Sequence, residues 1–195
     1  MCKRIATLCM AGLALLLAGR LQAEVTVGGQ APDFSLQDQN GKTVSLKDFT
    51  GKIVVLEWTN PNCPFVQRHY KMKTMQNLEA KYRDQGVVWV AVNSSKDVSN
   101  DGDKAWANEQ GISYPILNDE QTDVGKAYGA KNTPEMFIIG KDGTIQYLGA
   151  IDDDPRGEKA TPTNYVDQAL SELLAGKAVS VPQTRPYGCS VHYRD

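Results

Sequence analysis

The sequence predicts an α/β fold in which helices flank a central mixed sheet. Residues 53–58 and 87–92 form two continuous apolar runs rich in β-branched side chains, which is typical of strands buried on both faces of a sheet. Between them, residues 64–85 carry apolar side chains near helical spacing, and Gly86 follows. Strand, helix and strand make a crossover unit, so we expect the two strands to be parallel.

Two further pairs of segments predict antiparallel hairpins. Residues 34–37 and 43–46 alternate apolar and polar side chains and are joined by a link that contains Asn-Gly, a pair favoured in tight turns. Residues 136–139 and 144–148 are joined by a Gly-Lys-Asp-Gly link. Hairpin strands are antiparallel and crossover strands are parallel, so the predicted sheet is mixed.

The remaining segments predict helices and a tail. Residues 97–110 and 122–128 suit short helices, and residues 163–175 place their apolar side chains on one side of a longer one. Residues 179–195 contain two prolines and predict an irregular C-terminal tail, which carries Cys189. The expected organisation is therefore one α/β domain, residues 24–178, followed by the tail.

The first 23 residues predict a secretory signal peptide. A short basic start precedes an apolar run from Ile5 to Ala18, which is too short to span a bilayer comfortably, and a small residue, Ala23, stands at the expected cleavage point. An uncleaved membrane anchor is the alternative. Cleavage after Ala23 would remove Cys2 and Cys9, which leaves one pair of cysteines in a periplasmic or secreted protein.

Charge limits the classes of partner. The formal net charge of the chain is −2, and it becomes more acidic when Lys3, Arg4 and Arg20 leave with the signal peptide. A mildly acidic chain without a basic block argues against nucleic acid. Since no second apolar run is long enough to span a membrane, we expect no membrane association after cleavage.

Cys63 is the residue that indicates chemistry, because it stands where the first buried strand gives way to a helix. The unpaired N–H groups and positive dipole end of a helix N-terminus favour the thiolate, which is the nucleophilic form. A C-x-x-C site would carry its second thiol three residues later, where this chain has Val66. A second thiol must therefore come from a distant part of the chain.

The order of the elements and several motifs resemble the thioredoxin fold as used by the redoxin families. These include the alkyl hydroperoxide reductase/thiol-specific antioxidant group and the periplasmic thiol–disulfide oxidoreductases. The resemblance covers roughly residues 28–176 and is carried by Ala31-Pro32-Asp33-Phe34, by residues 58–66 around Cys63, by Thr133-Pro134 and by Lys141-Asp142-Gly143. It implies a thiol-dependent oxidoreductase that needs no cofactor and whose partner is a thiol reductant, a disulfide-bearing protein or a peroxide.

The resemblance also implies roles for single residues. Cys63 corresponds to the redox-active cysteine, and Thr133-Pro134 resembles the cis-proline turn beside it. The expected supporting residues are Thr59, Asn60, Pro64, Arg68, Thr133 and Pro134. Arg68 lies in the first turns of the helix, where a cation would lower the pKa of the thiol, although a solvated surface charge is the alternative.

Two departures from the families affect the expected activity. Related peroxiredoxins carry Pro-x-x-x-Thr-x-x-Cys, whereas here Leu56 and Asn60 occupy the proline and threonine positions and Thr59 is displaced by one residue. The departure from the dithiol oxidoreductases is Val66, which removes the local resolving thiol. These differences favour general thiol–disulfide exchange slightly over peroxide reduction.

Cys189 is the candidate resolving cysteine. It lies in the sequence Arg185-Pro186-Tyr187-Gly188-Cys189, where Gly188 permits a sharp turn that brings the tail back over its own domain or toward a neighbouring subunit. Cys189 would attack a mixed disulfide or a sulfenic acid at Cys63. A purely structural Cys63–Cys189 bridge, on a module that binds a partner, is the alternative.

A metal site and a buried acid complete the set of hypotheses. Cys63, His69, Cys189 and His192 are the cysteines and histidines that remain after cleavage, and together they match a Cys₂His₂ set for zinc or copper. This is the non-enzymatic metal-binding alternative. Glu57 closes the strand before Cys63 and is either a buried proton acceptor near the sulfur or a salt-bridged strand end.

Overall fold

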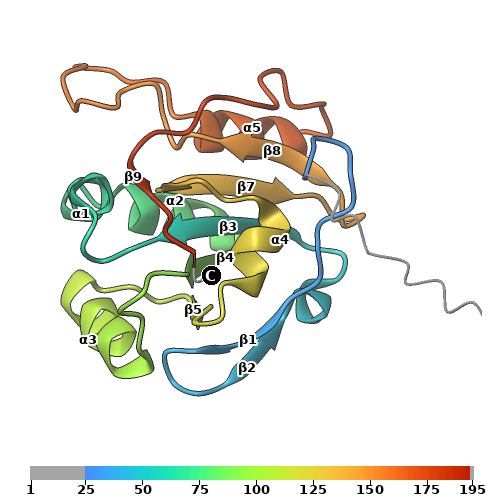
Figure 1. Ribbon diagram of the computed structural model, residues 1–195. Coiled ribbons are helices and arrows are strands. Elements are labelled where there is room, and N and C mark those ends of the chain that lie inside the picture. Colours follow the sequence, from blue (N-terminus) through green and yellow to red (C-terminus); the bar gives the residue numbers. More distant parts are fainter. Residues whose placement is uncertain (1–24, 194–195) are drawn as a thin grey trace, which may run out of the picture.

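The structure is a computed structural model that describes residues 25–193, and its centre is a seven-stranded mixed sheet (Figure 1). The strand order is β2-β1-β5-β4-β3-β7-β8, and β6 and β9 form a separate two-stranded sheet. The strands are β1 (Ser35–Asp38), β2 (Thr43–Ser45), β3 (Ile53–Thr59), β4 (Val87–Asn93), β5 (Ile116–Asn118), β6 (Asn132–Thr133), β7 (Glu135–Ile139), β8 (Ile145–Gly149) and β9 (Cys189–Ser190). The helices are α1 (Pro64–Lys71), α2 (Thr74–Tyr82), α3 (Asn100–Gln110), α4 (Asp123–Tyr128) and α5 (Tyr165–Leu174), with 3-10 turns η1 (Leu46–Phe49) and η2 (Arg83–Gln85).

The pairing of the strands confirms the predicted mixed sheet. β3 pairs in parallel with β4 over seven residues, and all seven β3 residues are buried, as expected for a central strand. β1 and β2 form one antiparallel hairpin, and β7 and β8 form the other, with an irregularity after Ile138. β7 also pairs antiparallel with β3, so the second hairpin extends the sheet beyond the crossover unit.

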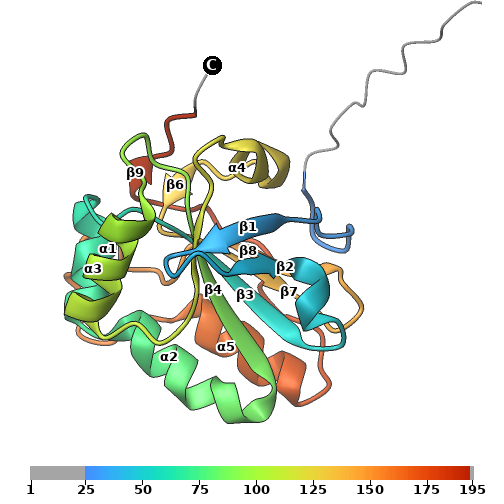
Figure 2. The same ribbon diagram turned by 90° about the horizontal axis from the view of Figure 1, so that it is seen from below.

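The two faces of the sheet bury separate apolar clusters. One cluster contains side chains of α1, α2, α3 and α5, and Cys63 belongs to it. The other lies under α4 and the β1–β2 hairpin and includes Trp58 and Phe137. Figure 2 shows the same division, with α2 and α5 on one side of the sheet and α4 on the other. Alternation along β3 explains it, since Ile53 and Val55 point into the first cluster and Trp58 into the second.

The structure differs from the sequence prediction in three places. The single helix predicted over residues 64–85 is two helices, because Lys73 adopts a left-handed conformation with φ of 60° and ends the first run. β5 was missed because it has only three residues, too few to show a periodic pattern. The tail is not irregular throughout: Cys189 and Ser190 pair antiparallel with β6, and Gln183 forms a parallel bridge with Leu148.

The predicted signal peptide, residues 1–23, lies outside the described residues. Within residues 25–193 no helix is long and apolar enough to cross a membrane.

Candidate active site

Cys63 is the N-cap of α1, as the sequence predicts. Its backbone is extended, with φ of −80° and ψ of 121°, and Pro64 takes the first helical position, where its missing N–H costs nothing. Asn60 shapes the approach to the helix: its carbonyl accepts the Cys63 N–H at 2.9 Å, and its side-chain oxygen accepts the Asn62 N–H at 2.8 Å. The turn therefore holds the sulfur at the helix N-terminus.

The second thiol is brought to Cys63 by strand pairing. Thr133 in β6 lies opposite Cys189 in β9, and the Cys63 thiol donates to the Thr133 carbonyl at 3.0 Å. The Thr133-Pro134 peptide bond is cis, which confirms that prediction. Both cysteines are free thiols, with Cys63 buried and Cys189 half-buried. The single residue Thr133 thus contacts both sulfur-bearing segments.

The environment gives the two thiols different acidities. Burial opposes ionisation of Cys63, but hydrogen bonds from the Cys189 and Thr133 side chains and from the Val66 and Cys189 backbone lower its pKa below the usual value. Burial raises the pKa of Cys189 to about 11, and the hydrogen bond and charge of Cys63 act in the same direction. Cys63 therefore ionises first, and the protonated Cys189 stabilises its thiolate.

Glu57 is a buried acid on the same face of the sheet. It is fully buried and accepts hydrogen bonds from the Trp89 indole at 3.0 Å and from the hydroxyls of Tyr70 and Tyr114 at 2.9 and 3.4 Å. Desolvation raises its pKa to about 7, although these donors oppose the shift. Because all three donors are neutral, the arrangement favours the buried-acceptor hypothesis over the salt-bridged strand end.

Arg68 does not lie as a solvated surface charge. Its guanidinium donates to the carbonyls of Asp154 and Pro155 at 2.8 and 2.9 Å and lies over the Tyr187 ring, 5.9 Å from its centre. Arg68 therefore joins α1 to the segment after β8 and contacts Tyr187 of the tail. Thr59 is 1% exposed, and its hydroxyl is buried beneath the turn that precedes Cys63.

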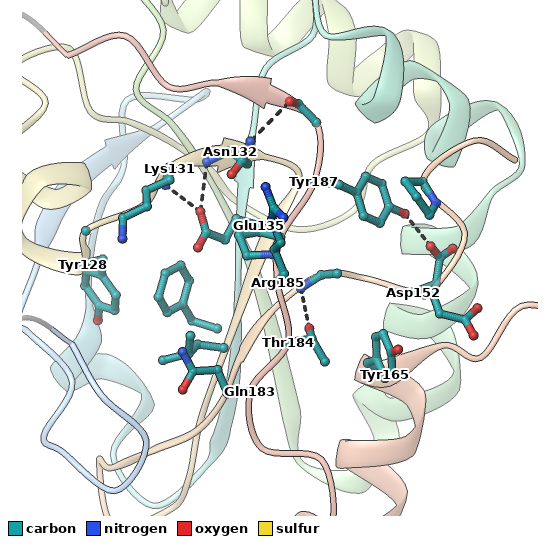
Figure 3. Close-up of a pocket in the computed structure, with 18 of the residues that line it drawn as sticks. Tyr128, Lys131, Asn132, Glu135, Asp152, Tyr165, Gln183, Thr184, Arg185 and Tyr187 are labelled. Atoms are coloured by element: carbon teal, nitrogen blue, oxygen red, sulfur yellow. Dashed lines mark hydrogen bonds between the residues drawn. The ribbon is translucent and has the colours of Figure 1, made fainter.

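A polar cluster that the sequence did not indicate joins the tail to α1. The Tyr187 hydroxyl donates a short hydrogen bond to Asp152, and it lies 2.9 Å from His69 Nε2 and 3.4 Å from an Arg68 nitrogen. Figure 3 shows Tyr187 pointing toward Asp152 across one end of a cavity. In the sequence, only the proximity of Tyr187 to Cys189 pointed to this cluster. Asp152 is 35 positions from Tyr187, and nothing in the sequence connected the two.

The structure does not assemble the proposed metal set. Within residues 25–193 no group of three or more His, Cys, Asp or Glu side chains is arranged to hold a metal ion. His69 is buried and turned to Tyr187, and burial lowers its pKa to about 4. His192 is exposed. The geometry instead unites the two thiols with Thr133 and Pro134.

The fold and the pair of thiols define the class: this is a thioredoxin-fold oxidoreductase. Residues 27–148 match the AhpC/TSA family. The chain therefore belongs to the AhpC/TSA family, as the resemblance predicted. The matched segment includes Cys63 and Thr133-Pro134 but ends before the tail, so the match does not test the position of Cys189.

Individual relatives agree with this assignment. The chain is 36% identical over 124 residues to a thiol-disulfide oxidoreductase ResA of Geobacillus thermodenitrificans, covering 64% of this chain and 69% of the relative. A crystal structure of an uncharacterized conserved protein from Geobacillus kaustophilus superimposes with a TM-score of 0.79 at 32% identity, over 87% of this chain and 93% of the other. A hypothetical protein from Sinorhizobium meliloti 1021 gives 0.81 at 27% identity, over 88% and 97%.

Proposed function

We propose that the protein is an exported thiol–disulfide oxidoreductase in which Cys63 is the nucleophile and Cys189 is the resolving cysteine. The observation that carries this proposal is the register of β6 with β9, which sets Cys189 opposite Thr133 while the Cys63 thiol bonds to the carbonyl of the same Thr133. The tail thereby supplies the second thiol that the local motif lacks, since Val66 occupies its position. The named ResA relatives support disulfide exchange as the reaction.

The proposed reaction transfers two electrons from the pair of thiols to a substrate disulfide. The Cys63 thiolate attacks one sulfur of that disulfide, which forms a mixed disulfide and releases the first substrate thiolate. Cys189 then loses its proton and attacks Cys63 Sγ, which releases the second substrate thiolate and leaves a Cys63–Cys189 disulfide. An external dithiol reduces this bridge and restores the starting state.

The acidities of the two thiols suit this order of events. The lowered pKa of Cys63 makes it the thiol that ionises first while Cys189 lies against it, and the raised pKa of Cys189 keeps the second thiol protonated until the first charge is gone. Once Cys63 is in a mixed disulfide it carries no negative charge, so a cause of the high Cys189 pKa disappears. Cys189 therefore loses its proton more easily once the mixed disulfide has formed, which is when it must attack.

Disulfide mapping tests the proposal. Oxidised protein should contain a Cys63–Cys189 bridge that mild reduction opens, and Cys189→Ser should accumulate the mixed disulfide that wild type resolves. A bridge that persists under mild reduction would favour the structural role, and the absence of any bridge would refute the pair. Ser190→Ala, which alters the neighbouring residue without removing a thiol, is the matched control.

Peroxide reduction is the second candidate, because the family match covers the AhpC/TSA group. Peroxide would oxidise Cys63 to a sulfenic acid, and Cys189 would condense with it to give the same disulfide and water. The buried hydroxyl of Thr59 and the missing proline at Leu56 favour disulfide exchange. Peroxide consumption by wild type at no more than the rate of Cys63→Ser would exclude this candidate.

Export is part of the proposal. We infer cleavage after Ala23, which leaves a mature chain of residues 24–195 in an oxidising compartment, where its partners are a thiol reductant and a disulfide-bearing protein. The mass of the N-terminal peptide of protein isolated from its native cells tests this inference. A mature protein that begins at residue 1 would contradict it.

A further inference from the structure

Cys63 is covered by the tail that carries the proposed resolving thiol, Cys189. Its exposed fraction is 1%, and both Tyr187 and Cys189 pack against the apolar cluster to which it belongs. A thiolate that attacks an external disulfide needs an open approach to the sulfur. The arrangement that brings the two thiols together is therefore one in which no protein disulfide can reach Cys63.

The tail is held by main-chain bonds, by side-chain bonds of Thr184 and by apolar side chains that pack on the core. Residues 182–193, which we name the strap, pair with the edge of β8 through the bonds Leu148 N–H to Pro182 O and Thr184 N–H to Leu148 O, both 3.1 Å long. Further on, the Val191 N–H donates to Lys131 O at 2.9 Å. Between these points the strap borders an open cavity of about 1200 Å³ (Figure 3). Along this stretch one side of the strap therefore faces open space.

Tyr187 connects the middle of the strap to α1, the helix that begins at Cys63. Its hydroxyl lies between Asp152, in the segment after β8, and His69 of α1. The ring also packs against Phe65, with ring centres 6.0 Å apart. We name these contacts of Tyr187 the latch. Because Tyr187 is two residues from Cys189, the latch contributes to holding the second thiol over the first.

Gly188 lets the strap approach Thr133 closely. Its φ is +125°, and a Cβ at this position would lie 2.0 Å from the Thr133 carbonyl oxygen. No side chain fits there unless the strap moves away. A single methyl group at residue 188 should thus displace β9 without removing any side chain of the latch.

We propose that the strap is a removable gate over Cys63: while β9 pairs with β6 the sulfur is covered, and release of the strap exposes it to a substrate disulfide. This inference takes its substrate from the proposed function, but the gate itself requires no turnover.

Alkylation of Cys63 in the reduced protein tests the gate. Iodoacetamide labelling, followed over time by peptide mass, should be slow at Cys63 in wild type and about tenfold faster in Tyr187→Phe, because loss of hydrogen bonds to a charged partner costs about 1.5 kcal/mol or more. Gly188→Ala should accelerate the labelling of Cys63 as well, because its methyl group displaces β9 while the side chains of the latch remain. Tyr82→Phe is the matched control, since that hydroxyl also binds an aspartate, Asp167, which lies in α5 and not in the strap.

The outcomes separate the gate from the proposed function. Equal labelling rates at Cys63 in wild type, Tyr187→Phe and Gly188→Ala would overturn the gate, even if the two cysteines form a redox couple. Faster labelling in both variants would support the gate, even if no disulfide exchange were found. Circular dichroism of each variant shows whether the domain has remained folded.

Discussion

The two thiols of the site are held in place by different kinds of interaction. Cys63 lies in the larger apolar cluster, at the start of a helix that packs on the sheet. Cys189 lies on a strap fixed by main-chain bonds, by one tyrosine cluster and by a glycine that allows close approach. The nucleophile is therefore positioned by the core, whereas the resolving thiol is positioned by contacts of the strap, which open separately in the proposed gate.

The largest expected effect is on the rate of disulfide exchange, in which the two thiols have different roles. Cys63→Ser should lower disulfide exchange by at least about a thousandfold, because a hydroxyl at this position is not ionised near neutral pH and is a poor nucleophile. Cys189→Ser should retain the first attack and lose only multiple turnover. Stopped-flow measurement of a single turnover checks both variants, and equal loss of the first attack would show that Cys189 takes part in it.

The difference between the two regions also explains which features of the site could be predicted from the sequence. Cys63, its helix and the cis bond before Pro134 were predicted because their signals are local or belong to a family motif. The place of Cys189 was predicted only as one option, because two-residue strands such as β6 and β9 have no periodic pattern. Contacts between residues far apart in sequence, such as Tyr187 with Asp152, depend on the completed fold.

The second prediction compares how much the core and the strap contribute to the free energy of unfolding. Phe137 is 2% exposed and packs against Trp58 and Tyr128, so Phe137→Ala should lower the free energy of unfolding by about 3–5 kcal/mol. Gly188→Ala should lower it by less than about 1 kcal/mol, since the strap can detach while the core stays packed. Urea titrations of both variants measure this. Similar losses would mean that strap and core unfold as one unit.

The third prediction concerns Glu57, the buried acid of β3. The pKa of Glu57 is raised by burial to about 7, so between about pH 4.5 and 7 the folded state binds more protons than the unfolded state. The stabilisation from this group is complete below that range and is lost as the pH rises through 7, by up to about 3 kcal/mol at 1.4 kcal/mol per pKa unit.

Glu57→Gln should therefore flatten the decline in stability between pH 5 and 8. Urea titrations across that range provide the measurement. Asp103→Asn is a useful comparison, because burial raises the pKa of Asp103 to about 6 and its effect should end at lower pH. An unchanged pH profile in Glu57→Gln would show that Glu57 does not titrate in this interval.

The smallest expected effect lies at the end of the strap. The Tyr193 hydroxyl bonds to the carbonyl oxygens of Gly125 and Ala130, and a Cβ on Gly125 would lie 2.6 Å from the Tyr193 ring. Tyr193→Phe keeps the ring in this tight contact and removes only the hydroxyl. The hydrogen bond is worth about 1 kcal/mol, so the local opening equilibrium should shift about fivefold.

Amide hydrogen exchange at Val191 measures that opening, because its N–H is bonded to Lys131 O. Exchange there should accelerate about fivefold in Tyr193→Phe, while exchange in the central strands β3 and β4 stays unchanged. Acceleration in those strands as well would mean that Tyr193 stabilises the whole domain. Acceleration at Val191 alone would show that even the last anchor of the strap governs an opening that is separate from unfolding of the core.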